Sequence, residues 1–229
     1  MVPEDKLSNS GENHLISDEW LVSYAAGNLS EAKSTLVATH AAFHPVLQRK
    51  IHSAEAMGGA LIEASETAEF SDGFYDRLVA KIDIDNSQDY RPMADNSSKT
   101  DPVLPQPLVN YLDRGLDELK WRYMGPGMRQ VKLHSDSNGE KLWLLKAKGG
   151  TEIPSHGHNG HEFTLVLQGS YSVDGQLFNV GDMELASDDI EDHRPIISEG
   201  KDCICLVVTE APINLKSITG RLFQPFIGL

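Results

Sequence analysis

The sequence predicts an α+β protein in which a small N-terminal helical bundle precedes a C-terminal jelly-roll barrel of short antiparallel strands. Three observations predict this class. Residues 15–85 carry apolar side chains at helical spacing, residues 86–107 are rich in Asn, Ser, Asp and Pro without periodicity, and short strand-like runs follow. The expected divisions are a helical domain over 1–85, a linker over 86–107 and a barrel domain over 108–229.

Three consecutive helices are expected at the start of the helical domain. The stretch SDEWLVSYAAG opens with a Ser-Asp capping pair and ends at Gly27, and LSEAKSTLVATHAAFH is capped by Ser30. Pro45 restarts the chain as a third helix after a tight corner. We expect this third helix to fray at Gly58 and Gly59, because glycine is a poor helix former.

A fourth, amphipathic helix is expected within SDGFYDRLVAKID. Its apolar stripe has i, i+4, i+8 spacing and consists of Phe74, Leu78, Val79 and Ile82. Such a stripe either packs back on the helical bundle or anchors a protein partner.

The net charge of the chain, −14, argues against nucleic-acid binding, because phosphate contacts need a basic surface. An acidic surface suits a basic protein partner, although it also serves solubility alone. The chain has no apolar run long enough to span a bilayer, and its polar, acidic N-terminus lacks the regions of a signal peptide. These features predict a cytoplasmic protein that does not bind membranes.

The stretch HGHNGHEFTLVLQG predicts a metal site. His156, His158 and Glu162 share a parity, so a regular strand places them on one face, while His161 points away. His193, after the acidic run SDDIEDH, is the expected fourth ligand. Zn²⁺ is the first expectation for such a ligand set, with Fe, Mn, Ni or Cu as alternatives.

The two cysteines, Cys203 and Cys205, lie two residues apart in the strand-like run CICLVVTE. Neighbours at this spacing on a strand are poorly placed for a structural disulfide, which fits a reducing compartment. Two interpretations stay open. The cysteines either pack as small apolar residues in one wall of the barrel or form an oxidant-sensitive pair near the metal site.

The metal stretch, taken with Gly150 and Gly169, has the spacing G-x5-H-x-H-x3-E-x6-G of the first cupin motif. The second motif is matched more loosely by Gly181 and His193, because its Pro and Gly are absent. Over about residues 108–215 the chain therefore resembles the cupin superfamily. The resemblance implies a double-stranded β-helix barrel with a metal ion in its mouth.

The series YAAG, LSEA and VATH, the helix FYDRLVAKI and the segment DCICL resemble ChrR-type anti-sigma factors over most of the chain. The resemblance implies that the helical domain sequesters an extracytoplasmic-function sigma factor, with the apolar stripe as an anchor. It also implies that the cupin domain releases sigma under singlet-oxygen or peroxide stress. Dimerisation of the sigma-free protein is left open. The alternative function is a metal-dependent cupin oxygenase or isomerase.

One departure from that family concerns its N-terminal zinc. Zinc-binding members carry an upstream His followed by H-x3-C-x2-C, whereas here His40 is followed by His44 and Leu47. His14 falls near the upstream ligand position. His14, His40 and His44 offer at most three ligands and no thiolate, so they predict at most a weak second metal site. We expect packing of Phe43 and Leu47 to replace a structural zinc.

Overall fold

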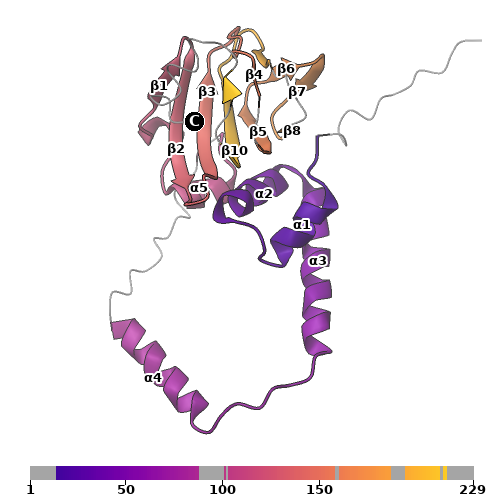
Figure 1. Cartoon of the computed structure of the whole chain (residues 1–229), viewed down its shortest axis with the longest axis vertical. Coiled ribbons are helices and arrows are strands. Elements are labelled where there is room, and N and C mark those ends of the chain that lie inside the picture. The colour runs from indigo at the N-terminus through magenta and orange to yellow at the C-terminus, as the bar shows by residue number, and fades with distance from the viewer. Residues whose placement is uncertain are drawn as a thin grey trace, which may run out of the picture.

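The computed structural model describes residues 14–87, 101, 103–157, 160–186, 194–211 and 214–215. Three helices lie against a barrel of strands, and a fourth helix stands apart from both (Figure 1). The predicted α+β class, with helices first and an antiparallel jelly-roll barrel second, is confirmed. Within the described residues, no helix is both long and apolar enough to cross a membrane.

The bundle consists of α1 (Asp18–Ala25), α2 (Glu31–Phe43) and α3 (Pro45–Glu63). The side chain of Ser30 accepts a hydrogen bond from the backbone N–H of Lys33 at 3.3 Å, which confirms the predicted cap of α2. The expected fraying of α3 was wrong, because the helix runs unbroken through both glycines. Glycine lowers helix stability by about 1 kcal/mol relative to alanine, which does not by itself end a helix.

The barrel follows α5 (Gln106–Leu112) and a short 3-10 helix, η2 (Leu116–Glu118). One sheet has the strand order β1-β2-β3-β10-β5-β8, a second has β7-β6-β9, and β11 pairs with β4. All these pairings are antiparallel. The strands are β1 (Arg122–Gly125), β2 (Met128–Ser135), β3 (Lys141–Ala147), β4 (His156–Gly157), β5 (Glu162–Gln168), β6 (Tyr171–Val173), β7 (Gln176–Phe178), β8 (Met183–Ala186), β9 (Ile196–Ile197), β10 (Cys203–Thr209) and β11 (Asn214–Leu215).

Strand β10 is buried along its whole length, because both faces of the six-stranded sheet are covered. Alternate side chains divide between two cores. Cys203, Cys205 and Val207 belong to the core inside the barrel. Leu206 and Val208 belong to a second core on the other face of the sheet, which the helices cover.

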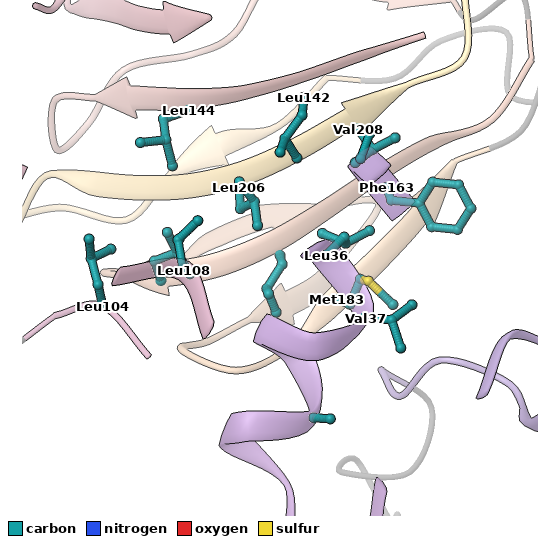
Figure 2. Packing of buried hydrophobic residues seen from close by; sticks show 14 of the residues in the cluster. Leu36, Val37, Leu104, Leu108, Leu142, Leu144, Phe163, Met183, Leu206 and Val208 are labelled. Carbon is teal, nitrogen blue, oxygen red and sulfur yellow. The ribbon is translucent and has the colours of Figure 1, made fainter. Parts of the chain in front are cut away.

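The second core joins the bundle to the barrel. Leu36 and Val37 of α2 face Phe163 of β5 and Val208 of β10 in Figure 2. Leu36 is fully buried there, and burial of a leucine side chain contributes about 1.5–3 kcal/mol. The bundle and the barrel therefore share one hydrophobic core.

Helix α4 (Phe74–Ser87) lies away from the bundle and the barrel (Figure 1). The four side chains of its apolar stripe are each 36 to 50% exposed. The structure therefore contradicts the interpretation in which this stripe packs back on the bundle.

Candidate metal centre and partner-binding surface

Strands β4 and β5 position two of the four predicted metal ligands. His156 lies in β4, Glu162 begins β5, and both are buried, at 6% and 8% exposure. His158 and His193 lie outside the described residues, and the residues that are described contain no group of three potential ligands. As predicted, His161 points away from the interior and is exposed.

The chemistry of these two residues fits a divalent cation. The carbonyl oxygen of Pro154 lies 2.9 Å from Nδ1 of His156 and can only accept a hydrogen bond, so Nδ1 carries the proton. The lone pair of Nε2 is then the ligand atom. Burial lowers the pKa of His156, which keeps the imidazole in the neutral form that binds metals.

Glu162 brings a carboxylate that a cation would stabilise. Burial and then the charge of Glu184 raise the pKa of Glu162 to about 8, against a smaller opposing effect of the Thr164 hydroxyl. A cation bound in the barrel replaces the proton of such a carboxyl group. Glu162 is therefore a competent ligand whose affinity for metal rises with pH.

The sequence reasoning missed a second buried carboxyl group, Glu184 of β8. It sits opposite Thr164 in the sheet register, two positions along the strand from the Glu162–Ala186 pair and on the same face of the sheet. Tyr171 of β6 donates a hydrogen bond from its hydroxyl group to Oε2 of Glu184 at 2.5 Å. Burial raises the pKa of Glu184 to about 7. The alternation in MELA puts Glu184 on the face opposite Met183 and Leu185, so the pattern predicted an outward-facing glutamate and not a buried one.

The two cysteines lie inside the same barrel. Their Sγ atoms are 3.6 Å apart and both side chains are buried, which confirms the interpretation that they pack in a barrel wall. The contact with Cys203 and then burial raise the pKa of Cys205, and Glu184 and Glu162 contribute to the same shift. The thiol of Cys205 therefore favours its protonated form, and both cysteines share the interior with the carboxyl groups.

The three N-terminal histidines are not assembled into a metal site. His14 stacks on Phe178 with 4.3 Å between ring centroids, and its Nδ1 is 3.4 Å from Oδ2 of Asp182. Nε2 of His44 lies 2.8 Å from the carbonyl oxygen of Gly181, and the ring of His40 lies edge-on to that of His44.

Apolar side chains surround the end of α2 at this point. Leu47 is buried in the shared core, and Phe43 is partly buried against it. Gly181 has a φ of +90°, and a Cβ atom there would lie 3.2 Å from Cβ of Phe43. The end of α2 is therefore in close contact with the turn before β8.

Fully buried His40 gives the chain a measurable pH dependence. Burial and then the nearby His44 lower its pKa from 6.5 to about 3, and the Gly181 carbonyl oxygen offsets this only partly. The unfolded chain binds a proton at His40 below pH 6.5, whereas the folded chain does not. Stability is thus present above pH 6.5 and is lost as the pH falls toward 3.

We expect the unfolding free energy to fall by about 2 kcal/mol more between pH 7 and pH 5 in the unmodified chain than in His40→Leu. Urea unfolding at a series of pH values measures this difference. His52→Leu is the matched control, because His52 is exposed, and it should keep the slope of the unmodified chain. Equal slopes in His40→Leu and the unmodified chain would contradict the assignment of a buried, neutral His40.

Exposed apolar side chains extend from α4 to the bundle. The ring of Phe70, four residues before α4, stacks on that of Phe74 at the start of the helix, with 4.6 Å between ring centroids. The free end of α3 exposes Met57, Leu61 and Ile62, which the sequence reasoning did not single out. A groove between α1 and α3 is lined by Asp18, Leu21, Val22, Val46, Arg49, Lys50, Ser53, Ala54 and Met57. Together these surfaces offer a partner two separate apolar contacts.

Comparisons with known proteins place these features in context. A family model described as the ChrR Cupin-like domain matches residues 114–212. The curated anti-sigma-E factor ChrR of Cereibacter sphaeroides is 39% identical over 217 residues, which cover 94% of this chain and 98% of that protein. A chain in the crystal structure of Rhodobacter sphaeroides SigE in complex with the anti-sigma ChrR is 36% identical. It superposes with a TM-score of 0.70, over 86% of this chain and 98% of its own length.

Proposed function

Because the chain belongs to the ChrR anti-sigma factor family, we propose that it sequesters an extracytoplasmic-function sigma factor and releases it under oxidative stress sensed in a metal-binding barrel. The observation that carries this proposal is the 39% identity to an anti-sigma factor over 94% of the chain. The same relative is a regulator, so an oxygenase or isomerase is not the function proposed.

The helices supply the sigma-binding surface. Phe74, Leu78, Val79 and Ile82 form an exposed stripe on a helix that stands apart from the bundle. The groove between α1 and α3 forms a second apolar surface. A partner that is held by both surfaces is enclosed from two directions, and this arrangement suits the masking of a protein from RNA polymerase.

The barrel supplies the sensor. His156 and Glu162, with His158 and His193, hold a divalent cation, with Zn²⁺ as the first expectation and Fe, Mn, Ni or Cu as alternatives. Cys203 and Cys205 lie within reach of each other in the same interior. An oxidant that enters the barrel therefore meets a dithiol in the interior that also holds Glu162, and oxidation of that pair disturbs the packing around the ligand.

Co-expression of the chain with the extracytoplasmic-function sigma factor of its own genome tests the proposal. We expect the two proteins to elute together in size-exclusion chromatography, and we expect the bound sigma factor not to start transcription in vitro. Separate elution of two folded proteins would refute sigma binding and would redirect attention to enzyme assays on the metal-loaded barrel.

A further inference from the structure

We propose that the Lys33–Glu210–His161 bridge is the physical link through which the metal-binding segment acts on helix α2, where the segment is residues 160–162 and carries the predicted ligand Glu162. The bridge consists of the ion pair and hydrogen bonds that join these three side chains. Its regulatory meaning rests on the proposed function, because α2 belongs to the sigma-binding bundle. The existence of the link itself is tested without sigma.

A single carboxylate makes the connection. Nζ of Lys33, on α2, donates to Oε1 of Glu210 at 2.7 Å. Oε2 of the same carboxylate accepts the backbone N–H of His161 at 3.0 Å and lies 3.0 Å from its ring Nδ1. The backbone N–H of Glu210 donates back to the carbonyl oxygen of His161 at 3.1 Å. One oxygen thus holds the helix, and the other holds the metal-binding segment.

The position of His161 makes this contact informative. His161 lies in the sequence between the predicted ligands His158 and Glu162, and it is held by its backbone as well as its ring. Gly160 has a φ of +115°, and a Cβ atom there would lie 3.3 Å from Cβ and Oε2 of Glu210. The segment is therefore fitted closely to Glu210, and a rearrangement of the segment moves the carboxylate.

The surroundings of Lys33 strengthen its side of the bridge. Lys33 and Glu210 are 19% and 28% exposed, so solvent screens their interaction less than at a free surface. Nζ of Lys33 is also 3.2 Å from Oε2 of Glu140 and 5.5 Å from the centre of the Trp20 ring. Although burial raises the pKa of Glu210, hydrogen bonds from Lys33 and His161 outweigh it and lower that pKa to about 2.

Other polar contacts between α2 and the barrel region end elsewhere. Oε1 of Glu31 lies 3.5 Å from Nδ1 of His134 on β2, and it also accepts a hydrogen bond from Tyr111 of α5. His44, at the end of the helix, contacts Gly181. In the described part of the chain, these contacts hold α2 in place without touching residues 160–162. When the segment rearranges, Glu210 is drawn from Lys33 while the other contacts remain.

Hydrogen exchange of the full-length chain, followed by mass spectrometry, tests the link with Lys33→Met. Lys33 does not itself touch residues 160–162, whereas its partner Glu210 does. We expect exchange of the amides of residues 160–162 to rise about fivefold, while amides of α3 keep their rates. Lys50→Met is the matched control, because Lys50 makes an exposed ion pair with Asp18, also at 2.7 Å, inside the bundle. We expect this control to leave the segment unchanged.

Glu210→Gln provides a second route to the same result. We expect the Lys33→Met/Glu210→Gln double variant to match Glu210→Gln alone, because both changes break one link. Lys33→Arg should restore the rates of the unmodified chain. The inference is overturned if Lys33→Met affects the segment no more than Lys50→Met, or if the two substitutions act additively.

A separate measurement carries the functional consequence. In complex with the sigma factor, Lys33→Met should bind as tightly as the unmodified chain but release sigma about fivefold more slowly after chelation of the metal. Release at the unmodified rate would overturn the regulatory role of the bridge. Failure of the unmodified chain to bind sigma would refute the proposed function, and the exchange experiment would still decide the link.

Discussion

Leu78→Asp is expected to weaken sigma binding by about 2–4 kcal/mol, or roughly 30- to 700-fold. Leu78 is at the centre of the α4 stripe and is 43% exposed in the free chain. The substitution therefore leaves the fold intact but places a charge where the partner would bury an apolar side chain. Titration of the full-length chain against the sigma factor measures the loss.

The control for this prediction is Leu185→Asp on β8 of the barrel. Leu185 is 48% exposed, so the same substitution is made at a similarly exposed leucine outside α4. We expect Leu185→Asp to bind sigma as the unmodified chain does. A loss of less than threefold in Leu78→Asp, with the melting temperature unchanged, would remove α4 from the sigma-binding surface.

His156→Ala is expected to lower metal affinity by more than about 100-fold. Loss of a residue that only orients a metal ligand already costs about 10- to 100-fold, so loss of the ligand itself costs more. His156 is buried, and because its Nδ1 proton is bound to the carbonyl oxygen of Pro154, Nε2 is the atom lost as a ligand. Metal content after dialysis, and competition with a coloured chelator, measure the effect. Sigma binding should persist while the response to oxidants is blunted.

His134→Ala is the matched control for the metal prediction. His134 is also a barrel histidine, but it faces Glu31 of α2 at 3.5 Å rather than the barrel interior. Its substitution should leave one metal ion in each chain. A full complement of metal in His156→Ala would show that the ion is held elsewhere, and the proposed centre would have to be abandoned.

The features that the sequence predicted correctly are those set by local chemistry. The Ser30 cap and the restart at Pro45 depend on a few neighbouring residues, and the inward parity of Cys203 and Cys205 depends only on the alternation of a strand. The α4 stripe was read from helical spacing. Its exposure was not predictable, because spacing alone does not tell which surface a stripe meets.

The features that were missed depend on which strands are neighbours. Glu184 reaches Tyr171 across two sheets, and Lys33 reaches Glu210 across 177 residues of sequence. Both contacts follow from the strand order β3-β10-β5-β8 and from the docking of α2 on that sheet. Parity assigns a residue to a face, whereas only the closed barrel decides what it meets there. His158 and His193 lie outside the described residues, so the predicted ligand set stays a prediction.

The core shared by α2 and the six-stranded sheet limits how this protein can be recombined. A chimera that joins these helices to a different sensory barrel leaves Leu36 and Val37 without Phe163 and Val208 unless the new barrel carries a matching apolar wall. The same holds for a barrel moved to other helices, because the apolar outer face of its sheet would be exposed to solvent. Substitutions on the α2 side and on the sheet side of this shared core are therefore expected to be inherited together.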